Sequence, residues 1–445
     1  METQLLKQVS KAKNYSDLYN ILWKMNLDTK VNKKFTSKIK IALFVNSCYG
    51  FGDIIFGLKI YNHIKEWYGI ECTVFTTKPS HFLKNGVKQS NLFMVKLPTS
   101  QPGDANCPDL KYTKIYNVDS KGKAGSQAAL SKTNFDLIFV APWIGTDFTP
   151  DKNIMKRFFP YANKFNTFLF SEYNAPDPHL YDFPTGIGKK YMGLLVTEES
   201  NIKRYPRLSI LKNPYIMAYV ADTDNSRCFN HFVKLMARKY HSKYQNLDIL
   251  IPEYVLNNES AIKSLIKYIK KKGYYKNVVL INKENRSELN ADSTLALRAD
   301  ITPLPYNEFV GLFNHALPDV LATGDQTVGD LISCCKKFNI YYQMMDWKVN
   351  FAKNLGKALG KNYITKKSSS CGLEKMKLDM TTNLDIIAKN NNFSIDGKKK
   401  MDAVVNGAIE LKNNTTLAKF TEIVMGSRQK STVVSKLKKA IPKKN

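Results

Sequence analysis

A glycine-containing turn between a short apolar run and a long amphipathic segment is the feature that most constrains how this chain can fold. Residues 40–46 (KIALFVN) have the length and composition of a buried strand. After the turn, apolar residues recur every three or four positions from Ile54 to Trp67, which predicts one face of a helix. Gly69 ends this helix, and residues 71–77 form the next predicted strand. A strand–helix–strand unit of this length predicts a right-handed parallel crossover.

The same alternation continues along the chain in two successive sets. Further strands are predicted within 135–142, 166–174, 214–225, 247–252, 276–282 and 339–344, with a helix at 307–316 and a strand, loop and helix within 319–338. Residues 118–133, rich in Gly, Lys and Ser, are predicted to form a loop. The predicted fold class is therefore α/β, with two parallel sheets, one for each set.

The length of the chain, 445 residues, is too great for one ordinary core, and its 43% apolar content supports folded domains. A basic, proline-containing stretch at 204–214 is expected to link the two domains. The predicted divisions are a helical lead-in at 1–38, a first α/β domain at 39–205, a second α/β domain at 206–365 and a basic helical extension at 366–445.

The formal net charge of +29 favours polyanionic partners, such as nucleic acid, an anionic membrane surface or phosphorylated small molecules. Residues 366–445 contain 17 basic and 7 acidic residues, so excess positive charge is denser there than in the rest of the chain. This tail is interpreted either as a solvated terminus or as a nonspecific contact for a polyanion or nucleic acid.

The seven cysteines are odd in number, scattered and without a C-x-x-C pair. This usage predicts a reducing compartment and no zinc site. No apolar run approaches the length needed to span a bilayer, and the first residues lack the apolar core of a secretion signal. We therefore expect a soluble protein of the cytoplasm.

The first candidate site is the turn itself, Gly50-Phe51-Gly52-Asp53. A loop that leaves a parallel strand and enters a helix presents backbone N–H groups, and glycines let a phosphate or sugar approach them. Ile55 occupies the third glycine position of the dinucleotide pattern, which disfavours a nicotinamide or flavin cofactor. Asp53 is interpreted either as a helix cap or as a base that accepts a proton from a substrate hydroxyl.

The second candidate site follows the strand within 319–338 and comprises Thr323, Gly324, Asp325, Gln326 and Thr327. Small hydroxylated residues at the start of a helix can hold an anion, and Asp325 and Gln326 can accept hydrogen bonds from sugar hydroxyls. The alternative is that Asp325 or Thr327 only caps the helix. Two such loops, each at the carboxyl end of a strand, predict a cleft between two facing domains.

Two further segments bear on phosphate binding. Lys348 is expected beside this crevice, where it would contact a phosphate, within a segment whose apolar residues otherwise indicate packing. Asp222 and Asp224 form a D-x-D after a predicted strand, an arrangement that can hold Mg²⁺ or Mn²⁺. Asp224 also suits the N-cap of the helix predicted at 226–239. The favoured prediction is that no metal or other cofactor is required.

The stretch FVNSCYGFGDIIFGLKI resembles the first strand–loop–helix of GT-B glycosyltransferases, notably heptosyltransferases with a Gly-x-Gly-Asp loop. The stretch LPYNEFVGLFNHALPDVLATGDQTVGDLI is similar to their nucleotide-sugar segment, although the E-x7-E pattern of many members is absent. The resemblance implies two Rossmann-like domains facing across a cleft, an acceptor domain at 39–205 and a nucleotide-sugar domain at 206–365. It also implies Asp53 as catalytic base, an acceptor side shaped by Gly50 and Gly52, and a donor pocket lined by residues 323–327.

Two functional hypotheses follow. The first is a metal-independent glycosyltransferase that moves a sugar from a nucleotide-sugar to an acceptor hydroxyl. The alternative is a non-enzymatic, nucleic-acid-associated protein, packaged in a virion, that retains this architecture. The first needs Asp53, and the second needs only the positive charge.

Overall fold

The computed structural model describes residues 20, 28–48, 51–101, 103, 107–130, 133–143, 150–197, 205–220, 227–285, 292–334, 337–343, 345, 348–360, 363–364, 377–383 and 385–413. The chain divides into two compact units. Unit 1 comprises Met1–Ser171, His179–Phe183 and Phe393–Asn445, and unit 2 comprises Glu172–Pro178 and Pro184–Asn392. The chain therefore first enters unit 2 at Glu172, before the boundary predicted at residue 205, and its last part returns to unit 1.

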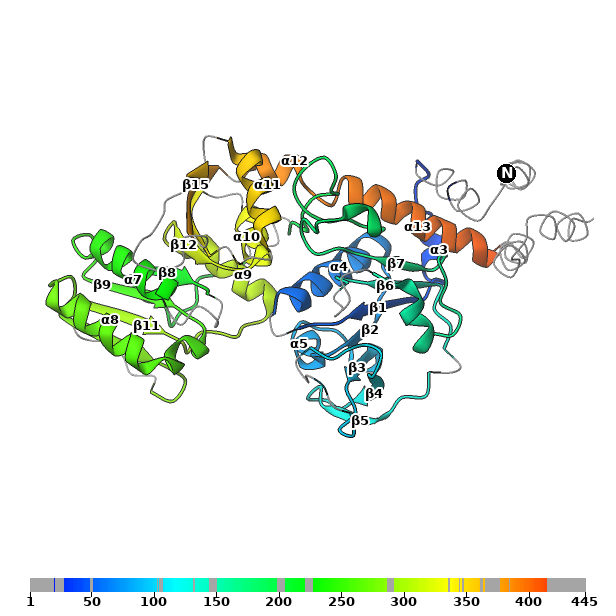
Figure 1. Ribbon diagram of the computed structural model, residues 1–445, viewed down its shortest axis with the longest axis horizontal. Helices are drawn as coiled ribbons and strands as arrows, with labels where there is room; N and C mark the ends of the chain where they lie inside the picture. Colours follow the sequence, from blue (N-terminus) through cyan, green and yellow to red (C-terminus); the bar gives the residue numbers. More distant parts are fainter. Residues whose placement is uncertain are drawn as a thin grey trace, which may run out of the picture. The chain divides into compact units, whose positions relative to one another are not determined.

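Unit 1 contains a seven-stranded sheet in the order β5-β4-β3-β2-β1-β6-β7 (Figure 1). The strands β1, β2, β3, β6 and β7 are parallel, and β4 and β5 add an antiparallel edge. The strand bounds are β1 Ile41–Val45, β2 Thr73–Thr76, β3 Leu92–Lys96, β4 Lys114–Val118, β5 Ala124–Gln127, β6 Leu137–Val140 and β7 Thr167–Leu169. The helices are α3 Lys33–Thr36, α4 Gly52–Tyr68, α5 Pro79–Lys84 and α13 Asp396–Asn413, with 3-10 turns η1 Gln89–Asn91, η2 Lys152–Arg157 and η3 Pro178–Leu180.

The central strand β1 is buried on both faces, which explains its unbroken apolar sequence. Ala42 and Phe44 face a core that also contains Phe75 and Phe159. The opposite face carries α4. A Cβ atom added at Gly57 of α4 would lie 2.6 Å from Cγ2 of Val45 and 3.3 Å from the carbonyl oxygen of Ala141. The absence of a side chain at residue 57 therefore lets α4 lie directly on the sheet.

Unit 2 contains an eight-stranded sheet in the order β10-β11-β9-β8-β12-β13-β15-β14 (Figure 1). The first six strands are parallel, whereas β15 and β14 are antiparallel to their neighbours. The strand bounds are β8 Tyr215–Ala218, β9 Asn246–Leu250, β10 Asn277–Ile281, β11 Thr294–Arg298, β12 Asp319–Ala322, β13 Lys337–Gln343, β14 Tyr363–Ile364 and β15 Lys377–Asn383. The helices are α7 Arg227–Tyr240, α8 Glu259–Lys271, α9 Tyr306–His315, α10 Asp325–Ser333, α11 Val349–Leu359 and α12 Asp385–Asn390, with the 3-10 turn η5 Glu253–Asn257.

Helices cover both faces of this sheet. Apolar residues of α7 and α8 share one core with the strand residues Ile216, Leu247 and Leu295. Tyr215 points to the opposite face, where its hydroxyl donates to the carbonyl oxygen of Leu312 in α9 at 2.6 Å. Alternation along β8 therefore assigns α7–α8 and α9 to opposite faces.

The sheet order also fixes where each unit can bind a ligand. In unit 1 the chain leaves β1 towards β2 on one side, and β6 lies on the other side. In unit 2 the chain leaves β8 towards β9, and β12 lies on the other side. Such reversals open a crevice at the carboxyl ends of the strands. The two loops singled out in the sequence follow β1 and β12, so each lies at a reversal.

The structure confirms the α/β class with two largely parallel sheets and corrects several details. The segment 118–133 contains strand β5 and is not only a loop. The extension at 366–445 is not only helical, because β15 pairs with β13 over its whole length and covers the backbone of what would otherwise be an edge strand.

Strand β11 escaped prediction because it ends in Arg298. This buried residue pairs with Asp300 at 2.7 Å and with Asp248 at 3.3 Å.

Among the described residues, no helix combines the length and apolar character needed to cross a bilayer.

Candidate functional site

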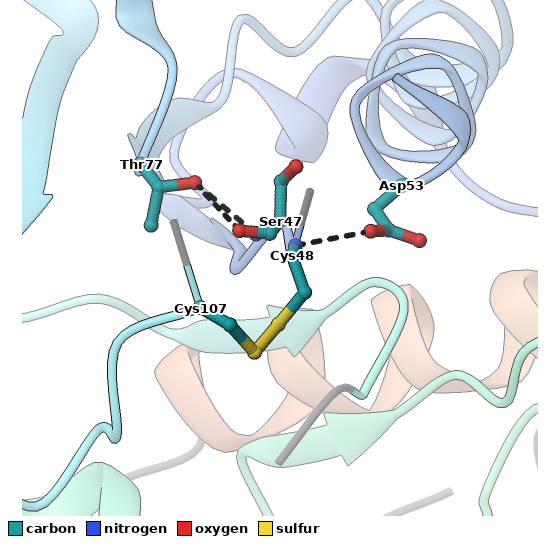
Figure 2. Close-up of a disulfide and its surroundings, with 5 residues drawn as sticks. All are labelled: Ser47, Cys48, Asp53, Thr77 and Cys107. Carbon is teal, nitrogen blue, oxygen red and sulfur yellow. Dashed lines mark hydrogen bonds between the residues drawn. A yellow bond between two sulfur atoms is a disulfide. The ribbon is translucent and has the colours of Figure 1, made fainter. Parts of the chain in front are cut away.

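The first candidate loop lies between Val45, the last residue of β1, and Gly52, the first residue of α4. The backbone of Ser47 is held by Thr77, whose hydroxyl accepts from the Ser47 N–H at 3.2 Å and donates to the Ser47 carbonyl at 3.4 Å (Figure 2). Because Thr77 directly follows β2, this contact ties the ends of two neighbouring strands together. Gly50 lies outside the described residues, and Gly52 is the first residue of α4.

Asp53 lies in the first turn of α4 and is partly exposed. Its Oδ2 atom accepts from the backbone N–H of Cys48 at 3.3 Å (Figure 2). The position before the helix is taken by Phe51, so Asp53 is not its N-cap. The carboxylate instead orients the loop, and its negative charge suits the positive end of the helix dipole. Asp53 therefore has a fixed orientation at the carboxyl edge of the sheet.

A disulfide bond between Cys48 and Cys107 crosses this loop (Figure 2). It joins the loop after β1 to the connection between β3 and β4, 59 residues later. The pair differs from what a reducing compartment favours, since disulfides persist mainly in oxidising environments. The compartment itself stays a prediction. Sequence spacing did not indicate the pair, because only the parallel order of β1, β2 and β3 brings the two segments together. Cys72, Cys228 and Cys334 are buried and do not take part in a disulfide.

Phe51 is one of the few large apolar side chains that reach solvent, with 45% of its surface exposed. Its ring packs edge-on against His81, with 4.8 Å between ring centroids. Burial is the main cause that lowers the pKa of His81, and Lys84 and Lys78 add to the effect. The loop after β1 thus presents an aromatic ring beside an imidazole whose charged form is disfavoured.

The second loop connects β12 to α10 in unit 2. Thr323 is buried, and its hydroxyl contacts the side chain of Gln343 and the carbonyl oxygen of Tyr219, the latter at 3.3 Å. These contacts link the ends of β8, β12 and β13, so the Thr323 side chain has a structural role here. Gly324 precedes the helix without a side-chain cap. A Cβ atom at Gly324 would lie 3.3 Å from the hydroxyl oxygen of the buried Thr327.

Asp325 and Lys348 are brought together at the start of two helices. Lys348 Nζ lies 3.3 Å from Oδ1 of Asp325, and the two side chains are 18% and 14% exposed. The Tyr342 hydroxyl donates to the same oxygen at 2.6 Å. Asp325 is the first residue of α10 and Lys348 precedes α11; neither helix start is closed by a side-chain cap. Backbone N–H groups of two helices and one ammonium therefore meet in a single region of unit 2.

Glu172 is a further member of this group that the sequence did not indicate. Its side chain reaches solvent but is crowded by protein, and this desolvation is the main cause that raises the pKa of its carboxyl. The negative charge of Asp325 adds to the rise, and the positive charge of Lys348 opposes it. Its position shortly after β7, at the carboxyl end of a strand, is the signal that sequence analysis could have used.

Two other acidic or amide residues of α10 differ in role. The Gln326 side chain is hydrogen-bonded to Tyr173, whose hydroxyl also accepts from the backbone N–H of Leu195 at 2.9 Å. Asp330 is buried and accepts from the Tyr306 hydroxyl at 2.7 Å. Asp330 therefore belongs to the interior of unit 2, whereas Gln326 stays partly exposed next to Asp325.

The predicted metal alternative falls outside the described residues, because Asp222 and Asp224 lie in the undescribed segment 221–226. Within the described part of the chain, no three His, Cys, Asp or Glu side chains are grouped as metal ligands. The favoured prediction of a reaction without metal remains a prediction.

The basic extension is described up to residue 413. On α13, Lys398 pairs with Asp402 at 2.7 Å, Lys399 with Asp28 at 2.9 Å, and Lys412 with Asp136 at 2.7 Å. These lysines therefore serve ion pairs within unit 1. The lysine-rich stretch after residue 413 lies outside the described residues.

Comparison of the sequence with protein-family models and with curated proteins finds no match. Among solved structures, the trehalose-6-phosphate synthase OtsA aligns over 87% of this chain and 99% of its own, at 9% identity and a TM-score of 0.36. A UDP-forming α,α-trehalose-phosphate synthase from Burkholderia vietnamiensis aligns over 89% of this chain and 99% of its own, at 10% identity and a TM-score of 0.35. At these values the alignments carry no argument about activity, and the fold rests on the topology of the two units.

Proposed function

We propose that this protein is a glycosyltransferase that moves a sugar from a nucleotide-sugar donor to an acceptor hydroxyl. The observation that carries the proposal is the Asp325–Lys348 pair at the uncapped starts of α10 and α11, at the carboxyl edge of a parallel sheet. Ligands of open α/β sheets bind at this edge. The proposed donor site is the region around residues 323–327.

The chemistry of the donor site follows from its groups. Two helix starts and Lys348 offer backbone N–H groups, dipole potential and one full positive charge to a diphosphate. Asp325 and Gln326 are acceptors for ribose or sugar hydroxyls. As the bond between the anomeric carbon and the diphosphate breaks, the leaving group gains negative charge, which Lys348 and the helix dipoles stabilise. A metal is not needed for this step.

Asp53 is the proposed base on the acceptor side. Its carboxylate would take the proton of the acceptor hydroxyl while the acceptor oxygen bonds to the anomeric carbon. The hydrogen bond from Cys48 fixes the orientation of the carboxylate, and the disulfide restrains the segment that supplies that bond. The half-exposed ring of Phe51 lies in the same loop and would bound the acceptor. The acceptor-side roles of Gly50 and Gly52 remain part of this proposal.

The donor site is tested by thermal unfolding of the full chain with UDP-, GDP- and TDP-sugars. At about 100 times the dissociation constant, a bound donor adds about 2.7 kcal/mol to the free energy of unfolding. We expect Lys348→Gln to weaken this binding by about tenfold or more, because a charge-assisted contact is lost. Lys353→Gln, an exposed lysine on the same helix, is the matched control and should leave binding unchanged. Stabilisation by none of the nucleotide-sugars would contradict the proposal.

A further inference from the structure

Unit 2 carries an uneven distribution of charge between its two helical layers. The α7 sequence contains no Asp or Glu, and the single acid of α8, Glu259, pairs with Lys263 at 2.8 Å. On the opposite face of the sheet, α9 and α10 contain three acids and no Lys or Arg, one of the acids being the buried Asp330. Helix α11, whose Phe351 packs against Tyr342 on that face, contains two lysines and no acid. The α7–α8 layer therefore differs from α9 and α10 but not from α11.

The positive charge of the α7–α8 layer is concentrated at one edge. Both helices run antiparallel to the strands, so they end where β9 and β10 begin (Figure 1). The turns after the two helices are in contact, because the rings of His241 and Tyr274 are 5.0 Å apart and the Tyr275 hydroxyl donates to the Tyr244 carbonyl at 3.4 Å. The exposed lysines of this edge, called here the basic edge surface, are Lys243, Lys267, Lys270, Lys271, Lys272 and Lys276.

These lysines are not used within unit 2. Among the described residues, no ion pair joins any of them to a carboxylate, including Asp292, which lies near the start of β11 at the same edge. In contrast, the neighbouring Lys239 pairs with Asp319 at 2.7 Å. Lys239 is therefore not counted in the basic edge surface. Interaction with the α8 dipole favours lysines in its last turn, but Lys243 and Lys276 lie beyond the helices. Six like charges held close together repel one another unless a polyanion neutralises them.

We propose that the basic edge surface binds the phosphate backbone of a nucleic acid. Lysines without specific geometry suit contacts with phosphates, which position a nucleic acid without selecting its sequence. A bilayer is a poorer match, because an interfacial membrane contact normally adds apolar anchors. The large apolar side chains that are exposed in the described part of the chain, Phe35, Phe51, Tyr112, Leu180, Ile210 and Ile395, lie on other segments.

The basic edge surface is separate from the proposed donor site. Helices α10 and α11 contribute their starts to the donor site, and α10 begins at the carboxyl edge of the sheet, directly after β12. The basic edge surface lies at the amino edge, where β9 and β10 begin. Nucleic-acid binding therefore does not depend on sugar transfer, and each can fail without the other.

The test is the salt dependence of binding between the full chain and a short fluorescent duplex DNA of random sequence. Each phosphate contact contributes about 0.9 to the slope of log affinity against log salt. The slope is negative, and we expect the combined variant K267Q/K270Q/K271Q/K272Q to reduce its magnitude by roughly 3 to 4. The matched control removes four charges from the C-terminal tail, as K436Q/K438Q/K439Q/K443Q, and should retain most of the slope.

Three results would overturn the inference. The first is an unchanged slope in the combined variant. The second is a reduced slope in the tail control alone, and the third is binding to phosphatidylserine vesicles without binding to DNA. The same titration with a short duplex RNA distinguishes the two sources of phosphate. Thermal unfolding of each variant, with and without nucleotide-sugar, shows whether its fold and its donor site are intact.

Discussion

Asp325 lies between a tyrosine hydroxyl and a lysine ammonium, and these two neighbours decide what it can bind. The sequence indicated this residue through its place after an apolar strand, and it also indicated Lys348. It could not indicate Tyr342 as a partner, because Tyr342 comes from the neighbouring strand β13. Glu172 lies more than 150 residues earlier, and only its place after β7 marks it as a candidate. Such partners depend on the order of strands in the sheet, which periodicity along the chain does not report.

Glu172 gives a prediction about pH. Desolvation and Asp325 raise the pKa of its carboxyl above the ordinary 4.5, so the folded state holds a proton that the unfolded chain releases. The free energy of unfolding therefore falls as pH rises from about 4.5 through the raised value, and it is unaffected below that range. We expect Glu172→Gln to be more stable than the wild type at about pH 7 and equal to it at about pH 3.5, measured by urea unfolding.

The control for this measurement is Glu259→Gln. Lys263 lowers the pKa of Glu259. The ionised Glu259 therefore contributes to the free energy of unfolding at neutral pH, and this contribution is lost as pH falls. The control variant should be no more stable than the wild type at about pH 7. A Glu172→Gln variant that behaves like the control would show that desolvation of Glu172 has no energetic consequence.

At the scale of elements, α4 shows how one residue sets the distance between a helix and a sheet. Sequence periodicity predicted this helix and the strand before it, because both bury apolar side chains in a regular pattern. Periodicity did not predict the role of Gly57, since a glycine within a helix otherwise lowers stability. The residues that a Cβ would meet are Val45, the last residue of β1, and Ala141, which directly follows β6.

Gly57→Ala is expected to destabilise the protein. A gain of about 0.5 to 1 kcal/mol in helix propensity is opposed by overpacking against Val45, which costs about 1 to 3 kcal/mol. Gly407→Ala in α13 is the matched control, because no atom lies within 4 Å of a Cβ built there. The control should raise the midpoint of thermal unfolding, and Gly57→Ala should lower it. Equal shifts in the two variants would contradict close packing of α4 on the sheet.

Three of the strands that sequence analysis missed each have their own physical cause. In β11, a buried ion pair between Arg298 and Asp300 replaces the apolar end expected of a central strand. In β5, all four residues are exposed, so no alternation marks the strand. In β15, pairing with β13 supplies the reason for a strand inside a polar, lysine-rich segment. Apolar patterning thus located strands with an uninterrupted apolar sequence, including the edge strands β7 and β10, but not strands that end in a buried ion pair or depend on backbone pairing.

At the scale of the whole molecule, the chain combines two α/β units with a large excess of positive charge. The sequence predicted the number of units and the fold class because strand and helix patterns alternate twice. It found the excess charge densest in residues 366–445. There Lys398, Lys399 and Lys412 of α13 form ion pairs, whereas no ion pair joins the lysines of the basic edge surface to a described carboxylate. The disulfide between Cys48 and Cys107 was beyond prediction, because the two residues meet only through the order of the strands.

The central claim, sugar transfer with Asp53 as the base, is tested most directly by the release of nucleoside diphosphate from a nucleotide-sugar in the Asp53→Asn variant. Asparagine keeps an oxygen that can accept from the Cys48 N–H, so the fold and donor binding should be retained. The account predicts that turnover falls by about 10² to 10⁴, because the acceptor proton has lost its base. Unchanged turnover in Asp53→Asn, or no release by the wild type with any UDP-, GDP- or TDP-sugar, would contradict it.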